Sequence, residues 1–177
     1  MPILIFAACK KEESAKIPLH DRSFAWLMTL PLGYANNSGD TLFTSNYAEV
    51  SEYISESVIP NQFPNYTQTE RYTQTIQIDS FLNYQTILIA EINQDMTRND
   101  LVSIQFSRTG QSFLQMFGNA EPFYTLIAPY RDSVVLNGVV YENIYSQSNG
   151  QQLEMFVNFE DGLVGFTLDT DTFNIVN

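Results

Sequence analysis

The stretch from residue 133 to residue 166 constrains the fold of this chain more than any other. It consists of β-branched and aromatic runs at residues 133–136, 139–145, 153–159 and 163–166. The first two runs meet at Asn137-Gly138 and the last two at Asp161-Gly162. Asn-Gly and Asp-Gly pairs accept the positive φ that tight hairpin turns require. These residues therefore predict an antiparallel meander.

The rest of the chain shows the same alternation of apolar runs and turn clusters. We expect further strands at residues 23–30, 41–44, 67–77, 86–92, 101–107 and 173–176. Residues 86–92 are apolar on both faces, which is typical of a central strand. Residues 113–117 fit either a strand or one helical turn, and Arg98-Asn99-Asp100 is predicted to close a turn.

Residues 47–59 are ambiguous. Glu49, Glu52 and Glu56 have helical spacing, whereas Tyr53 and Ser55 fit the alternation of a strand. We favour a strand because Ser, Tyr, Val and Ile are mediocre helix formers. No long segment has a 3.6-residue period, so the sequence predicts an all-β fold with little helix: an antiparallel meander, a sandwich or a partly open barrel.

Length and charge limit the classes of protein that remain. The 177 residues, 44% of them hydrophobic, suffice for one well-buried core. All three lysines lie before residue 17, and residues 23–177 carry four arginines against 17 acidic residues. A body this acidic repels phosphate backbones, so we expect no nucleic-acid partner.

The N-terminus has the pattern of a cleaved leader. Residues 2–8 are apolar and end in Ala7-Ala8, and the only cysteine of the chain, Cys9, follows directly. An apolar run too short to span a membrane, then small residues, then the charged residues 10–13, is typical of the end of a secretory signal. A basic start is missing, so we expect the leader to begin upstream of residue 1. The alternative is a buried strand with an inert thiol.

Residues 5–9, Ile5-Phe6-Ala7-Ala8-Cys9, resemble the lipobox of bacterial lipoproteins. The resemblance implies that Cys9 is acylated and becomes the first residue of the mature chain. Lys10-Lys11-Glu12-Glu13 is similar to the export signal of Bacteroidota surface lipoproteins. We therefore expect a leader end at residues 1–8, the lipidated cysteine and a spacer at 9–22, and one β domain at 23–177. Phe6 departs from the usual leucine.

The closing hairpins are similar to those of lipoproteins from the same bacteria. The matching residues are 136–144, with their Asn-Gly turn and Tyr-x-Asn-Ile strand, and 161–166, which begin Asp-Gly-Leu-Val. The resemblance carries an architecture and no activity. Together with Cys9 it implies a membrane partner reached through acyl chains, at the outer membrane or cell surface, or on the periplasmic face.

Residues for catalysis are few. The single histidine, His20, lies in the expected spacer, and the body has no lysine and no nucleophile, phosphate-loop or zinc motif. We expect no enzyme activity and no cofactor. A carboxylate glycosidase is the open alternative, since it needs only two acids. Asp169 and Asp171 are weak candidates for a calcium site, and turn formation explains them better.

Aromatic residues supply the candidate binding surface. We take Tyr141, Tyr145 and Trp26 as candidate binding residues, because aromatic side chains bring contact area at low entropic cost. The ligand class stays open among glycan, protein and lipid. Two functions compete with the glycosidase: a lipid-anchored binding module, and a carrier of an apolar ligand. A carrier would enclose a cavity lined by Ile87, Ile89, Phe106, Phe156 and Phe166.

Overall fold

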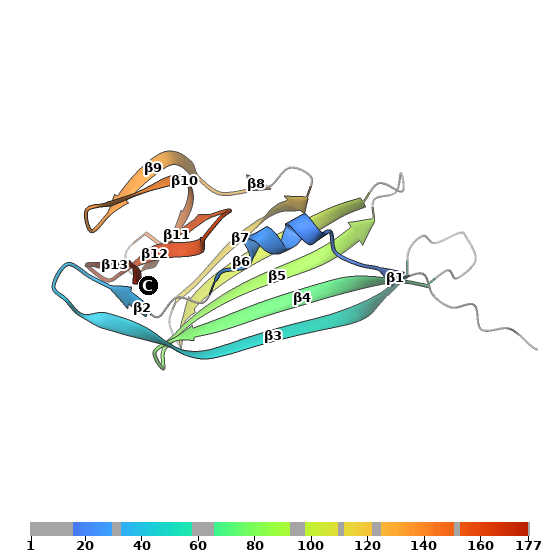
Figure 1. Ribbon diagram of the computed structural model, residues 1–177, viewed down its shortest axis with the longest axis horizontal. Coiled ribbons are helices and arrows are strands. Elements are labelled where there is room, and N and C mark those ends of the chain that lie inside the picture. Colours follow the sequence, from blue (N-terminus) through green and yellow to red (C-terminus); the bar gives the residue numbers. More distant parts are fainter. Residues whose placement is uncertain are drawn as a thin grey trace, which may run out of the picture.

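The chain folds into one long, curled antiparallel sheet (Figure 1). A computed structural model describes residues 16–29, 33–57, 66–92, 98–109, 112–121, 125–150 and 153–176. The expected all-β class, with an antiparallel, partly open arrangement and little helix, is confirmed. Cys9 and the leader lie outside the described residues.

The described elements follow one another with short connections. They are β1 (Lys16–Ile17), the 3-10 helix η1 (Asp21–Trp26), β2 (Gly33–Ala35), β3 (Thr41–Ser57), β4 (Tyr66–Ile78), β5 (Leu82–Ile92), β6 (Arg98–Arg108), β7 (Ser112–Glu121), β8 (Thr125–Leu126), β9 (Tyr130–Leu136), β10 (Val139–Ser148), β11 (Leu153–Asn158), β12 (Gly162–Leu168) and β13 (Asp171–Val176). The spatial order is β8-β7-β6-β5-β4-β3-β2-β13-β12-β11-β10-β9, and β1 pairs in parallel with β4.

The sheet turns a corner at β2 and β3 and so forms two facing leaves. We call β3–β8 the long leaf, and β2 with β9–β13 the short leaf. β3 pairs with β2 over its first three residues and with β4 over the rest, with a register shift between Thr44 and Asn46. Gly33 sits at the corner, where a Cβ would lie 2.6 Å from the carbonyl oxygen of Leu42. Only glycine permits this approach of the two backbones.

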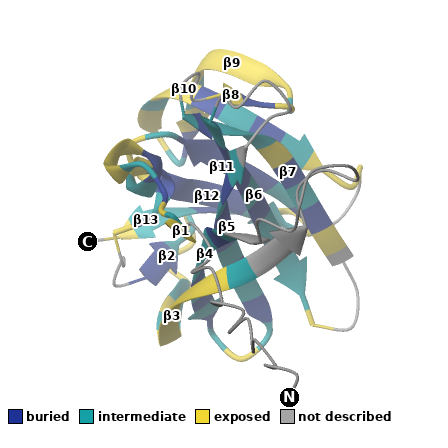
Figure 2. Ribbon diagram, turned by 90° about the vertical axis from the view of Figure 1, so that its right-hand side faces the viewer, coloured by how far each residue is buried: buried dark blue, intermediate teal, exposed yellow. Residues whose placement is uncertain are grey.

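The main core fills the space between the two leaves. Val102, Ile104 and Phe106 of β6 are buried, as their alternation predicts. The ring of Phe106 packs on Phe166 of β12 at a centroid distance of 5.1 Å, and Phe166 packs on Phe173 at 5.2 Å. Figure 2 shows the buried residues concentrated between the leaves.

A second, smaller core lies behind the short leaf. The β9–β10 hairpin arches over that face (Figure 1), and its buried residues Leu136 and Ile144 form this core with Phe156 and Val164 of the short leaf beneath it. The tip is tied down by Asn137, whose Nδ2 lies 2.8 Å from the carbonyl oxygen of Thr172 and 3.1 Å from that of Ala35. Asn137 has a φ of 50° and Gly138 a φ of 81°, as expected for the predicted turn.

The strands of the long leaf agree with the sequence in most places. Residues 47–57 belong to β3, so the strand interpretation of residues 47–59 is confirmed over the described part. Residues 113–117 lie in strand β7 and form no helical turn. The predicted turn at residues 98–100 is wrong, because these residues are the start of β6 and pair with β5.

The N-terminal segment differs most from the prediction. Residues 23–30 were expected as a strand, but η1 covers Asp21–Trp26 and no strand includes the described residues 23–29. Residues 16–22, expected as a spacer, are packed on the sheet: β1 pairs with Gln68 and Thr69 of β4, and Leu19 is buried. We call residues 16–29 the strap. It crosses the concave side of the long leaf (Figure 1).

Side chains of the long leaf hold the strap where it has no neighbouring strand. Glu70 Oε2 accepts from the amide of Leu19 at 2.8 Å. Gln74 makes two hydrogen bonds to the backbone of Met28. Its Oε1 accepts from the Met28 amide at 2.9 Å, and its Nε2 donates to the Met28 carbonyl oxygen at 3.0 Å. Buried backbone groups need such partners, so β4 offers the strap the bonds that a strand would have supplied.

Asp100 is the central anchor of the strap. Its carboxylate is fully buried, and Oδ2 accepts from the His20 amide at 2.6 Å and from Ser23 Oγ at 2.6 Å. His20 Nδ1 lies 3.1 Å from the same oxygen, and Arg98 Nε donates to Oδ1 at 3.3 Å. A buried carboxylate is tolerated because these donors replace water.

Replacing Asp100 by Asn tests this anchor. We expect Asp100→Asn to lower the free energy of unfolding by about 3 kcal/mol, because it removes a buried charge on which four donors converge. Urea denaturation measures the change. The control is Asp169→Asn, an exposed carboxylate paired with Arg108, which should cost about 0.5 kcal/mol. Equal losses in the two variants would contradict the anchoring role.

Candidate functional site

The candidate site is an open cleft where β10 loses its partner strand. β10 pairs with β11 only from Tyr145 to Ser148, because β11 ends at Asn158 and the chain turns into β12. The cleft beside this free edge has a volume of about 500 Å³. Its lining residues are Tyr130, Val140, Tyr141, Glu142, Asn143, Tyr145, Asn158, Phe159, Glu160 and Asp161.

The bend of β10 at Asn143 shapes the cleft. Asn143 has a φ of 55°, a left-handed conformation that asparagine tolerates better than most residues. Its Oδ1 accepts from the hydroxyl of Tyr130 at 2.8 Å, which ties the bend to β9. Tyr141 before the bend and Ile144 directly after it belong to the second core, whereas Tyr145 packs against the main core.

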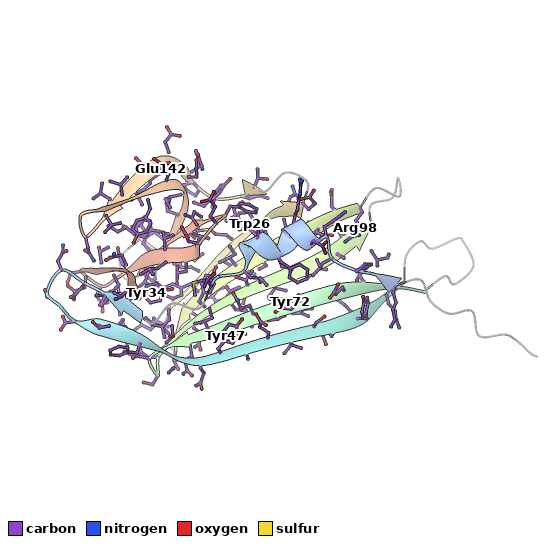
Figure 3. All side chains as sticks on the ribbon, viewed as in Figure 1. Trp26, Tyr34, Tyr47, Tyr72, Arg98 and Glu142 are labelled. Carbon is purple, nitrogen blue, oxygen red and sulfur yellow. The ribbon has the colours of Figure 1, made fainter. Side chains whose placement is uncertain are left out.

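Aromatic rings form one wall of the cleft and continue into the core. Tyr130 packs edge-on against Tyr145 at a centroid distance of 5.3 Å. Trp26 of the strap lies 6.4 Å from Tyr145 and 5.2 Å from Phe159, centroid to centroid. Trp26 itself is fully buried, and its Nε1 has no hydrogen-bond partner among the described residues. Figure 3 shows Trp26 on η1, on the side of the strap that faces the short leaf.

The opposite wall is a polar turn. The amide of Asp161 donates to Asn158 Oδ1 at 2.6 Å, and Asn158 Nδ2 donates to Asp161 Oδ2 at 3.0 Å. Asn158 is buried, so its side chain fixes the turn from inside and leaves Glu160 exposed on the rim. The rim thus carries the carboxylates of Glu142, Glu160 and Asp161 beside the rings.

A second polar cluster lies on the concave side of β3 and β4, away from the cleft (Figure 3). The hydroxyl of Tyr47 donates to Glu49, and Gln74 Nε2 donates to the Tyr47 hydroxyl at 3.3 Å. Hydrogen bonds from Tyr47 and Tyr72 lower the pKa of Glu49. Desolvation, followed by the bond to Glu49, raises the pKa of Tyr47 and of Tyr72. These groups use their hydrogen-bonding atoms on one another, so we do not take the cluster as a binding site.

Two tyrosines of the main core are also perturbed. Burial raises the pKa of Tyr84 to about 12, and burial with the nearby phenols of Tyr84 and Tyr141 raises that of Tyr34. The hydroxyl of Tyr34 donates to the carbonyl oxygen of Leu163 at 3.2 Å. Both phenols stay neutral at physiological pH, so they serve the core.

Two of the three candidate binding residues lie at the cleft, and the third is buried behind them. Tyr141 and Tyr145 line it, and Trp26 packs directly beneath Tyr145. Sequence reasoning did not place Tyr130 and the residues of the 158–161 turn in one site. The signal for the turn was present, since Asn158 and Asp161-Gly162 bracket it. Nothing in the sequence indicated that this turn faces β10, because that depends on the early end of β11.

The weak metal candidates flank the β12–β13 turn but have different neighbours. Asp169 Oδ2 lies 3.2 Å from Arg108 Nη1. Asp171 borders a small polar hollow of about 180 Å³ with Asn137 and the turn at Asn36. Within the described ranges, no three His, Cys, Asp or Glu side chains lie close enough to hold a metal ion.

The five residues expected around a carrier cavity are divided among three places. Phe106 and Phe166 pack on each other in the main core, and Phe156 belongs to the second core. Ile87 and Ile89 point to the convex face of the long leaf, since they alternate with the core residue Leu88. The five side chains surround no common space.

Ser23, His20 and Asp100 share a site without the order of a catalytic triad. Ser23 Oγ and His20 Nδ1 both lie against Asp100 Oδ2. A serine nucleophile needs the imidazole as its base, with the carboxylate on the far side of the ring. Here the carboxylate stands between the two, so the cluster is built to anchor the strap.

Comparisons with known proteins give no family. No protein-family model, curated protein or solved structure matches the chain. Over the residues that the structure describes, no helix combines the length and the apolar character needed to cross a membrane.

A pair of variants at Asn143 tests the bend that shapes the cleft. Both Asn143→Gly and Asn143→Ala lose the bond to Tyr130, but only alanine also pays for the positive φ. We expect Asn143→Ala to be less stable than Asn143→Gly by about 1 kcal/mol in urea denaturation. An alanine variant as stable as the glycine variant would show that the bend needs no left-handed residue.

Proposed function

We propose that this chain is a lipid-anchored cell-envelope protein that binds a ligand, without catalysis, in the cleft at the bend of β10. The observation that carries the proposal is the cleft itself, where Tyr130, Tyr145 and Phe159 stand beside rim carboxylates that have no ion-pair partner among the described residues. Ligand sites are usually concave, with aromatic walls and a few polar groups that orient the ligand.

The position of the strap supports the anchored part of the proposal. β1 enters the sheet beside Gln68 and Thr69, at the end of the long leaf away from the β9–β10 hairpin (Figure 1). Six residues lie between Cys9 and Lys16, and the seven steps from one Cα to the next reach at most about 25 Å when fully extended. An acylated Cys9 would therefore keep this end of the molecule close to the membrane.

The cleft would then face away from the membrane. β3 alone has 17 residues, a length of about 56 Å at the usual rise, and the labelled Glu142 lies near the opposite end of the molecule in Figure 3. Because the cleft would lie far from the end of the molecule that Cys9 holds at the membrane, we expect its ligand to come from outside the membrane. This arrangement suits a protein of the outer membrane or cell surface.

A carboxylate glycosidase is the second candidate, because Glu142, Glu160 and Asp161 border one cleft. Such enzymes need an acid whose pKa burial or a neighbour has raised, together with a second carboxylate across the scissile bond. Glu142 and Glu160 are exposed, which favours binding over hydrolysis. Release of reducing ends from a glycan panel, lost in Glu142→Gln, would overturn the non-catalytic proposal.

The binding site is tested with residues 9–177 carrying Cys9→Ser, which keep every described residue. A panel of glycans, fatty acids and short peptides is screened by calorimetry. Tyr130→Ala should weaken the binding of a ligand found in the screen by about tenfold, because it removes one ring of the wall. Tyr47→Ala, a similarly exposed tyrosine on β3, is the control. Equal effects of the two variants would place the ligand elsewhere.

The anchor is tested on the full chain with a complete leader, including a basic start, placed upstream of residue 1 and expressed in a bacterial host. The wild-type protein should appear in the membrane fraction, with a mature N-terminus at acylated Cys9 in mass spectra. Cys9→Ser should abolish both the acylation and the cleavage, because it removes the thiol that carries the acyl chains. The variant should also lose stable anchoring, to which each buried CH₂ of an acyl chain contributes about 0.8 kcal/mol. An unmodified thiol on a chain that keeps its leader would contradict the proposal.

A further inference from the structure

The charges of the cleft narrow the chemistry of its ligand. Its ionisable side chains, apart from the tyrosines, are Glu142, Glu160 and Asp161, and all three are acidic. The carboxylate of Asp161 accepts one hydrogen bond, from Asn158 Nδ2, whereas Glu142 and Glu160 are exposed and have no ion-pair partner among the described residues. The cleft therefore presents negative charge that the described part of the protein leaves unneutralised.

The arginines of the body are all committed elsewhere. Each lies within 4.0 Å of a carboxylate outside the cleft, in the pairs Arg71–Glu52, Arg98–Asp100, Arg108–Asp169 and Arg131–Glu154. Lys16 lies over the ring of Tyr53 at the other end of the long leaf, and Arg22 does not line the cleft. No cation of the described residues is placed to occupy the site.

The aromatic wall of the cleft is a second feature that favours a cationic ligand, and it acts independently of the carboxylates. Tyr130, Tyr141, Tyr145 and Phe159 line the same cleft. The faces of aromatic rings carry partial negative charge and attract ammonium and guanidinium groups, more strongly where water is displaced. Beneath them Trp26 packs on Tyr145 and Phe159, so the wall is backed by a rigid core.

We propose that the cleft takes a ligand with an organic cation, an ammonium or guanidinium group, seated on the tyrosine wall between the rim carboxylates. This inference rests on the proposed binding function and names its ligand class. An anion would meet only like charge. A neutral sugar would find rings and acceptors, but it would leave the carboxylates uncompensated, so it binds more weakly than a cation of similar size.

The test uses residues 9–177 with Cys9→Ser and four probes. Lysine amide, spermidine and choline offer the cation as an amino-acid side chain, a free polyamine and a quaternary ammonium. The Nε-acetyl form of lysine amide is the matched neutral probe. Calorimetry measures the dissociation constants, and the emission of Trp26, the single tryptophan, reports occupancy of the cleft. Which cationic probe binds best distinguishes the three sources.

We expect at least one cationic probe to bind about tenfold or more tightly than the neutral probe, in line with the strength of hydrogen bonds to charged groups. Glu142→Gln and Glu160→Gln should each weaken it about three- to tenfold, and raising the salt concentration should weaken it further. Glu52→Gln makes the same charge change at a loosely paired carboxylate of β3 and should have no effect beyond about twofold.

Four results would overturn the inference, and the last of them also removes the proposed function. Equal binding of the cationic and neutral probes excludes a cation site. A loss in Glu52→Gln as large as in the cleft variants shows attraction to the whole acidic surface only. Binding of a neutral ligand that depends on Tyr130, without binding of cations, removes this inference and leaves the binding function standing. No binding of any probe or panel ligand removes both.

Discussion

The attachment of the strap to the inside of the long leaf is the interaction on which the rest of the structure depends. Beyond β1, the strap runs across the concave side of the sheet, where its backbone has no strand beside it. Glu70, Gln74 and Asp100 supply the missing hydrogen bonds from three side chains of β4 and β6. Buried backbone without such partners would be too costly, so these three residues decide that the strap can lie there at all.

The position of the strap in turn sets the position of Trp26. The indole fills the space between the two leaves and touches Tyr145 and Phe159. A bent single sheet has no second layer to close its open side, and the strap provides part of that closure. Tyr145 and Phe159 also line the cleft. Trp26 therefore connects the strap, which the long leaf anchors, to the candidate site on the short leaf.

The cleft itself results from a mismatch of strand lengths. β10 continues beyond the end of β11, and at Asn143 it bends over the back of the short leaf. The free edge and the 158–161 turn then face each other. The rim of the cleft carries three carboxylates. They are not neutralised within the described residues, because the arginines of the body pair with other carboxylates. The cleft differs from the other acidic parts of the surface because aromatic rings stand beside carboxylates that have no ion-pair partner among the described residues.

The sequence by itself determined the strand-rich fold, the meander with its Asn137-Gly138 and Asp161-Gly162 turns, and the acidic body, because alternation, turn chemistry and charge are local properties. It could name Tyr141, Tyr145 and Trp26 but could not show that they meet. Tertiary structure alone decided that Asp21–Trp26 forms a 3-10 helix and that Asp100 is buried in a strand. The reason is that both depend on partners about 80 residues apart in the chain, and no local pattern records which side chain will supply a missing hydrogen bond.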